Sequence, residues 1–276
     1  MALRPFLPIL RDTHASLGET LSVLQQRELL RRRGFLLGSL AAAAALPLRS
    51  MACTLIPSET GGPYPGDGTN GPNALTQSGI VRSDIRSSFG ASGTASAAGT
   101  PLNVTLRLVS TVSGCVPLAG LAVYIWHCNA GGGYSMYSSG ITGQNYLRGV
   151  QVSNANGEVT FTSIFPGCYP GRWPHIHFEI YRSLAQATSG ANAARISQLA
   201  LPQSVCSTVY SQSSLYPGST QNLSGVTLNS DNVFGNDGGV YQLAATSGSN
   251  AAGYASTLEV GVAIEGSDLL FADGFE

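Results

Sequence analysis

Apolar and polar residues alternate in several short runs along the chain, beginning near residue 100. Alternation predicts β-strands, because successive side chains of a strand point to opposite faces of a sheet. Gly and Pro separate the runs, and no segment after residue 52 keeps a helical period. We therefore predict an all-β chain, a β-sandwich of mostly antiparallel strands with long loops. The predicted strands are 102–110, 119–128, 157–165, 175–181 and 257–265.

Between and around these runs the pattern predicts loops. Residues 53–75 hold so many Gly and Pro residues that neither a strand nor a helix can extend through them. Residues 87–100 are expected to form a loose loop, and residues 185–199 a short helix or lid. Residues 207–240, rich in Ser, Asn and Gly, are predicted to be long loops, and loops of that length are functional or mobile.

The N-terminal segment has another pattern. Arg32 and Arg33 stand just before an apolar run, 35–48, which is the arrangement of an export signal. The sequence RRGFL is similar to a twin-arginine signal. The run is shorter than the roughly 20 residues that cross a bilayer. Small residues at positions 50 and 52 suit cleavage before Cys53; a buried helix and an acylated Cys53 are the alternatives.

We therefore expect three parts: an export signal, 1–52, a β-sandwich domain, 53–266, and a C-terminal tail, 267–276. The signal predicts the twin-arginine export machinery as a partner and a periplasmic or extracellular location. It also predicts that the chain has no stable membrane association once the signal is removed. The twin-arginine route carries folded proteins, which suits a protein that takes up a metal before export.

The composition changes this picture little. Hydrophobic residues make up 43% and charged residues only 11%, which favours an exported all-β domain over a helical one. The formal net charge of −1 gives no indication of binding to nucleic acid or to an anionic membrane. In an oxidising compartment five cysteines form at most two disulfides, and the spacing leaves the pairing open. The cysteines are Cys53, Cys115, Cys128, Cys168 and Cys206.

Candidate chemistry is concentrated in the segment 168-CYPGRWPHIHFEIY-181, which holds two of the four histidines. In a strand, His175 and His177 share one face about 7 Å apart, so both imidazoles can bind one metal ion through bonds of roughly 2 Å. Zinc and copper sites use the same spacing. The alternative without a metal is a pair of solvent-facing histidines, so the pair alone leaves the chemistry open.

Two tyrosines narrow the choice of metal. Tyr169 lies in the turn that leads into the histidine strand, and Tyr134 follows three consecutive glycines in 126-WHCNAGGGYSMY-137. Consecutive glycines indicate a backbone that passes close to another group. Tyr137 competes with Tyr134 on position alone. A phenol has a pKa near 10 and ionises readily only on a strongly Lewis-acidic ion, so two tyrosines and two histidines favour non-haem Fe(III).

Longer motifs surround these residues. The segments WHCNAGGGY, NYLRGVQ, FPGCYPGR and HIH, together with LIPSETGGPYP and IVRSDIR, resemble the intradiol ring-cleavage dioxygenases, the family of protocatechuate 3,4-dioxygenase and catechol 1,2-dioxygenase. Among these the chain is most similar to exported single-domain members. The resemblance extends from about Cys53 to Ile264 and implies a β-sandwich that holds Fe(III). It implies an oxidoreductase that uses O₂ to cleave a catecholic ring between its two hydroxylated carbons, giving a muconate-type diacid.

The resemblance also implies a role for each site residue. Tyr169 is the tyrosinate that the substrate displaces, and Arg172 stabilises negative charge over the substrate. Gln198 falls where the family has a glutamine near the site, although the spacing before it is longer here. The implied metal ligands are Tyr134, Tyr169, His175 and His177.

The pocket is less well defined by these motifs. Tyr64 is expected on its wall, but the Gly61–Gly62 pair beside it departs from the family's glutamate-glycine. Arg148 is the one basic residue that could hold a ring carboxylate. Two other functions remain as alternatives: a copper or zinc protein that uses only the histidine pair, and an exported, non-catalytic β-sandwich that binds phenolics or polysaccharide.

Overall fold

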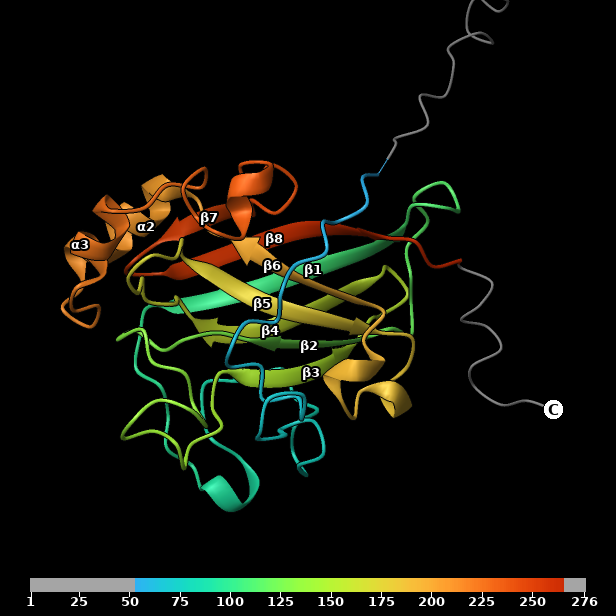
Figure 1. Ribbon diagram of the computed structural model, residues 1–276, viewed down its shortest axis with the longest axis horizontal. Coiled ribbons are helices and arrows are strands. Elements are labelled where there is room, and N and C mark those ends of the chain that lie inside the picture. Colours follow the sequence, from blue (N-terminus) through green and yellow to red (C-terminus); the bar gives the residue numbers. More distant parts are fainter. Residues whose placement is uncertain (1–52, 266–276) are drawn as a thin grey trace, which may run out of the picture. The chain divides into compact units, whose positions relative to one another are not determined.

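Two four-stranded sheets form the core of the computed structural model, which describes residues 53–265 (Figure 1). The first sheet has the strand order β4-β1-β8-β7, and the second has the order β3-β2-β5-β6. All strand pairs are antiparallel except β1 with β8. The strands are β1 (Pro101–Ser110), β2 (Ala122–Trp126), β3 (Arg148–Val152), β4 (Glu158–Ile164), β5 (His175–Tyr181), β6 (Arg195–Ala200), β7 (Ala245–Ser249) and β8 (Gly253–Val262).

The sheets pack face to face through alternate residues of their strands. On β5 the inward side chains are Ile176, Phe178 and Ile180, and they join one core with residues such as Leu106 of β1 and Phe161 of β4. The predicted β-sandwich of mostly antiparallel strands is therefore confirmed. Five of its strands lie within or close to the predicted ranges, and β5 has the predicted bounds.

Three strands, β3, β6 and β7, were not predicted, and the segments 185–199 and 207–240 differ from their predicted structure. The end of segment 185–199 belongs to β6, not to a helix or lid, because β5 pairs with it along its length. Residues 207–240 are not simply loops: they include part of α2 (Gln203–Gln212), and all of α3 (Ser219–Ser224) and a short 3-10 helix, Phe234–Asn236. In α2 the buried residues are Cys206, Val209 and Tyr210, a spacing that places them on one helical face.

The outer face of the second sheet is covered by loops. Its outward residues on β2, Tyr124 and Trp126, pack in a second apolar cluster with Leu75, Ile80 and Tyr134 from the segments before β1 and after β2. This cover makes β2 and β5 buried on both faces. Shorter 3-10 helices lie in the connecting segments, at Gly90–Ser92, Leu184–Gln186 and Gly190–Asn192.

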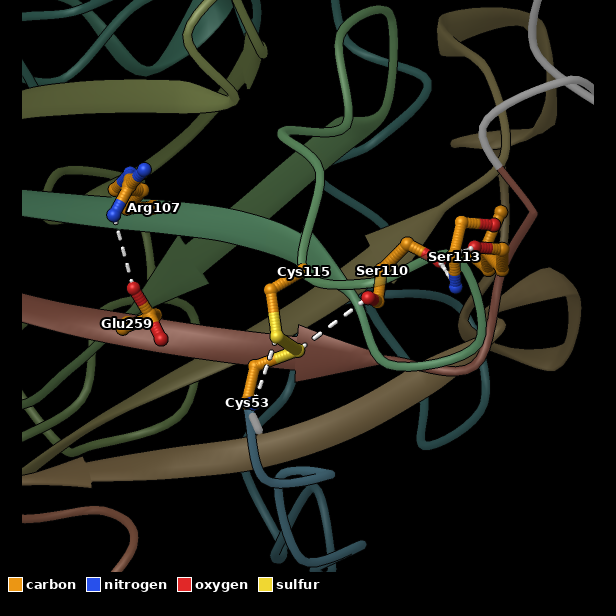
Figure 2. Close-up of a disulfide and its surroundings, with 7 residues drawn as sticks. Cys53, Arg107, Ser110, Ser113, Cys115 and Glu259 are labelled. Carbon is orange, nitrogen blue, oxygen red and sulfur yellow. Dashed lines mark hydrogen bonds and ion pairs between the residues drawn. A yellow bond between two sulfur atoms is a disulfide. The ribbon is translucent and has the colours of Figure 1, made fainter. Parts of the chain in front are cut away.

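A disulfide joins Cys53 to Cys115 and resolves the pairing that the spacing left open (Figure 2). It fastens the first described residues to the connection after β1, close to Ser110, and the backbone N–H of Ile56 donates to the carbonyl of Gly261 on β8. Cys128, Cys168 and Cys206 are buried free thiols. Across residues 53–265, no helix combines the length and apolarity needed to cross a membrane. The expected signal, 1–52, and the whole of the expected tail, 267–276, lie outside the described residues.

Candidate active site

Strand β5 presents both histidines on the outer face of the second sheet. His175 and His177 are buried, and their Nε2 atoms lie 3.1 Å apart. The Nδ1 atom of His175 hydrogen-bonds to the backbone carbonyl of Trp173, so Nδ1 carries the proton and the Nε2 lone pair faces the site. The ring of His177 stacks on Trp126 at 4.8 Å and 7°. Both imidazoles are thus held with Nε2 pointing to one place.

Two phenol oxygens converge on the same place. The hydroxyl of Tyr134 lies 3.3 Å from that of Tyr169 and 3.4 Å from the Nε2 atom of each histidine. The hydroxyl of Tyr169 lies 3.2 Å from Nε2 of His175. Four donors about 2 Å from a single ion in a tetrahedral arrangement would be about 3.3 Å from one another. The residues present therefore fit one metal ion.

The protonation of these four groups favours a strongly Lewis-acidic ion. Burial lowers the pKa of His175 to about 3 and that of His177 well below its usual value, so both imidazoles are neutral. Burial raises the pKa of Tyr169 to about 12 and raises that of Tyr134 well above its ordinary value. Phenols this weakly acidic lose their protons only to a cation of high charge, and hard phenolate oxygens with imidazoles fit ferric iron.

Local hydrogen bonds aim Tyr134 at the site. The side-chain oxygen of Asn129 accepts from the backbone N–H groups of Gly131 and Gly133 and so shapes the glycine turn. The hydroxyl of Ser138 accepts from the backbone N–H of Tyr134. A Cβ on Gly132, whose φ is +85°, would come within 3.1 Å of the Cβ of Tyr169. The close approach expected from the consecutive glycines is thus an approach to the second tyrosine.

Tyr137, the competitor on position, points elsewhere. Its hydroxyl accepts from the backbone N–H of Gly66 and donates to the carbonyl of Asn70. It therefore ties the turn that carries Tyr134 to the N-terminal segment, and it is not among the converging donors.

Arg172 lies at the edge of the site, in a charged hydrogen-bond network. Its Nε donates to Asp231 at 2.9 Å and its Nη2 donates to the side-chain oxygen of Gln198 at 2.6 Å. Gln198 stands opposite His177 on β6 and donates to the carbonyl of Thr60. The structure thus places both predicted residues together beside the metal-ligand candidates.

Asp231 is a functional candidate that the sequence did not reveal. Its side chain is fully buried and accepts from Arg172 and from the backbone N–H groups of Trp173, Val233 and Phe234. Burial alone would raise the pKa of this carboxyl, but these hydrogen bonds hold the pKa below its usual value. The carboxylate is therefore ionised and fixes Arg172 and the 231–234 turn together. No local signal distinguishes it in a Ser- and Asn-rich segment.

A cavity of about 360 Å³ opens beside Tyr134 and Tyr169. Tyr64 contributes to its wall and lies against the ring of Tyr134, with 5.1 Å between centroids. A Cβ on Gly62, whose φ is +70°, would lie 3.3 Å from Cε1 of His177, so the glycine lets the N-terminal segment approach the imidazole. The lining residues are Thr60, Gly62, Pro63, Tyr64, Gly132, Tyr134, Ser138, Tyr169, Arg172, Asn232 and Val233.

Arg148 is not among the lining residues and lies behind the pocket wall. It is only 1% exposed, and its guanidinium donates to the carbonyls of Tyr64, Pro65 and Ser135 and to the hydroxyl of Tyr124. All these acceptors are neutral groups of the protein itself. Arg148 therefore helps to fix the position of the segment that carries Tyr64. Its guanidinium does not lie where a substituent on the substrate ring would reach it.

Comparisons with known proteins indicate which class of protein this chain is similar to. A family model described as "Dioxygenase" matches residues 72–189, the segment that carries Tyr134, Tyr169, Arg172, His175 and His177. The predicted resemblance to intradiol ring-cleavage dioxygenases is confirmed by this match and by the solved structures described next, which together support an oxidoreductase of the dioxygenase class.

Two solved structures show the similarity over most of the chain. One is an intradiol ring-cleavage dioxygenase from Tetranychus urticae, with 29% identity, a TM-score of 0.58, and coverage of 76% of this chain and 94% of that one. Another dioxygenase crystal structure has 29% identity and a TM-score of 0.59, and covers 79% of this chain and 98% of its own. The curated proteins gave no significant match.

Proposed function

We propose that this protein is a non-haem Fe(III) dioxygenase that cleaves a catecholic ring between its two hydroxylated carbons and releases a muconate-type diacid. The observation that carries the proposal is the convergence of two phenol oxygens and two imidazole nitrogens, with Tyr134 and His175 each 3.1–3.4 Å from the other three donor atoms. Tyr134, Tyr169, His175 and His177 would hold the iron. When bound, the ferric ion would make a chelated diol reactive toward O₂, and because both oxygen atoms enter the product no external reductant is required.

The two tyrosines differ in a way that assigns them different tasks. Tyr134 is 2% exposed and lies beneath Tyr64, whereas Tyr169 is partly exposed and has the cavity beside it. An incoming diol can therefore reach Tyr169 more easily than Tyr134. With a pKa of about 12 in its buried setting, the Tyr169 oxygen is a strong base once it is free, and it would accept a hydroxyl proton of the substrate.

Arg172 would stabilise negative charge on the substrate during the reaction. Its guanidinium lines the cavity, and Asp231 and Gln198 hold it in a fixed orientation. A cation that is already oriented needs little reorganisation as charge develops, which is the condition for effective electrostatic stabilisation. Trp126 and the cover formed by the N-terminal segment would keep water from the histidines.

The visible absorption spectrum of the purified, ferric-loaded protein tests this function directly. We expect a red-brown colour from tyrosinate-to-Fe(III) charge transfer, and a shift to longer wavelength when catechol is added without O₂. Admission of O₂ should then give a muconate-type diacid. A protein that stays colourless after ferric loading would refute the iron–tyrosinate site, and would leave the phenolic-binding alternative.

We also propose that the chain is exported by the twin-arginine machinery and acts in the periplasm or outside the cell. The Cys53–Cys115 disulfide supports this location, because disulfides persist mainly in oxidising compartments. Replacement of both Arg32 and Arg33 by Lys should retain the protein in the cytoplasm. Unchanged export of this variant, measured by cell fractionation, would count against the twin-arginine route.

A further inference from the structure

The charges around the cavity indicate which catechols it accepts. Among the described residues that line it, Arg172 is the only one with a formal charge at neutral pH. The carboxylate of Asp231 neutralises this cation at 2.9 Å. We infer that the site selects an uncharged catechol over one with a ring carboxylate, and that Asp231 is the residue that sets this preference. The inference deepens the proposed function and rests on it.

The positive charge of Arg172 is already partly compensated by protein groups, while three of its five N–H donors are not bound to Asp231 or Gln198. Its Nε is bound to Asp231 and its Nη2 to Gln198, and its side chain is only 13% exposed. A second carboxylate, that of Glu59, lies within electrostatic reach of the guanidinium. A substrate carboxylate would thus meet a cation that two protein acids already surround, and like charges in one pocket disfavour binding.

Arg148, the other nearby cation, does not provide a positive charge for a substrate carboxylate. Arg148 is buried behind Tyr64, and its donors are occupied by backbone carbonyls and the Tyr124 hydroxyl. One buried acid, Asp67, lies within electrostatic reach of Tyr124, as Arg148 does, whereas burial raises the pKa of nearby Glu179 to about 8 and keeps that carboxyl largely neutral. Arg148 therefore presents neither a free donor to the cavity nor an uncompensated positive charge.

The rest of the lining suits neutral ring substituents. Thr60, Ser138 and Asn232 offer neutral hydroxyl and amide groups, while Pro63, Tyr64 and Val233 offer apolar contacts. Hydroxyl, methyl, methoxy or amide groups on the ring can be accommodated by such surfaces without an ionic partner. A buried carboxylate without a partner would be disfavoured, because the protein would not replace its lost hydration.

A matched pair of probes tests the inference. The compounds 3,4-dihydroxybenzamide and 3,4-dihydroxybenzoate have nearly the same shape and differ in charge. Binding of each to the ferric-loaded protein is measured by calorimetry without O₂, and cleavage is measured separately by O₂ uptake. We expect the amide to bind at least about ten-fold more tightly than the carboxylate, the effect of one unfavourable charge interaction in a partly buried site. Equal binding, or tighter binding of the carboxylate, would overturn the inference.

Two variants test the role of the local charge. Asn232→Lys adds a cation at the cavity rim, at an exposed side chain that makes no hydrogen bond with the other described residues. Asp231→Asn removes the acid beside Arg172 but also weakens the 231–234 turn. Each should shift the amide-to-carboxylate binding ratio toward the carboxylate by roughly ten-fold. Glu259→Gln, which also removes one acid but on the exposed face of the first sheet, is the control and should leave the ratio unchanged.

The outcomes separate the preference from the reaction. Selective binding of the amide without cleavage of either compound would refute the proposed function, and the measured ratio would still support the preference. Cleavage of both compounds with equal affinity would support the function and overturn the preference. If Asn232→Lys and Glu259→Gln change the ratio alike, the preference does not depend on charge near Arg172, and the role of Asp231 is wrong.

Discussion

The two sheets of the sandwich treat their outer faces differently. Along β1 and β8 buried and exposed residues alternate, so the first sheet has one face in the core and one in solvent. On β2 and β5 every residue is buried, because the segments before β1 and after β2 cover the outer face. The converging phenols and imidazoles lie under that cover. A sheet face thus becomes a site for metal chemistry when loops remove it from water and bring further donors to it.

The largest effect should follow the loss of one converging donor. Tyr134→Phe keeps the ring that packs under Tyr64 and removes only the oxygen. Loss of a group that supports a metal ligand typically costs 10–100-fold. Loss of a ligand itself is therefore expected to lower kcat/KM by at least about 1,000-fold, or about 4 kcal/mol. Iron content and the charge-transfer band should fall with it.

Tyr137→Phe is the matched control, since it removes a phenol oxygen from the same turn. That oxygen bonds Gly66 and Asn70 and takes no part in the convergence. We expect its iron content and absorption to remain close to those of the unaltered protein. If the two variants lost iron equally, Tyr134 would not be a ligand.

A change at the far end of the first sheet should affect stability and leave the site intact. The disulfide closes a loop between positions 62 residues apart. Replacement of both Cys53 and Cys115 by Ser should lower the free energy of unfolding by about 2–4 kcal/mol, because the unfolded chain regains freedom. Urea denaturation of the double variant measures this loss. Reduction of the unaltered protein should reproduce it, and a reduced protein of unchanged stability would contradict the prediction.

A histidine between the sheets should make stability depend on pH. The Nε2 atom of His127, just after β2, lies 2.7 Å from the hydroxyl of Ser163 on β4, and burial lowers the pKa of His127 to about 4. The unfolded chain, with a pKa near 6.5, binds the proton first as pH falls. The contribution of this residue is therefore complete above pH 6.5 and is lost between pH 6.5 and 4, at a cost of up to about 3 kcal/mol.

Chemical denaturation of metal-free protein at neutral and acidic pH measures this dependence. Other titrating groups act in both proteins, so the test is the difference from His127→Gln. This variant should lose about 2–3 kcal/mol less on acidification to pH 4.5 than the unaltered chain. Equal pH dependence of the two proteins would show that His127 titrates normally.

The smallest effect is expected on the solvent face of the first sheet. Arg107 and Glu259 form an ion pair at 3.0 Å between β1 and β8, and both side chains are about half exposed (Figure 2). Solvent and salt screen such pairs, so Arg107→Gln should change stability by less than about 1 kcal/mol and leave activity unchanged. A loss of stability well above this value, measured by urea denaturation, would show that solvent does not screen this ion pair on the outer face of the first sheet.

Local sequence patterns predicted the structure correctly where a feature depends on a single strand or turn. The alternating residues of β5 predicted both its bounds and the shared face of His175 and His177, and the glycine turn predicted a close approach near Tyr134. The strand β7, with the sequence ATSGS, has no apolar alternation, because it is an edge strand whose residues are largely exposed. Asp231 acquires its role only through contacts with distant residues, and the burial of Arg148 likewise depends on the N-terminal segment.

The parallel pairing of β1 with β8 also has a consequence for the order of folding. It joins residues about 150 positions apart, such as Leu102 and Tyr254, whereas β2, β3, β5 and β6 pair over shorter distances along the chain. During synthesis the second sheet and the β1–β4 pair can form while β1 still lacks its parallel neighbour, β8. The chain must therefore wait for β8 before the core closes, and such distant pairing makes folding slow. Until then the part of the core that Leu258 and Val260 of β8 complete is open to water and to chaperones.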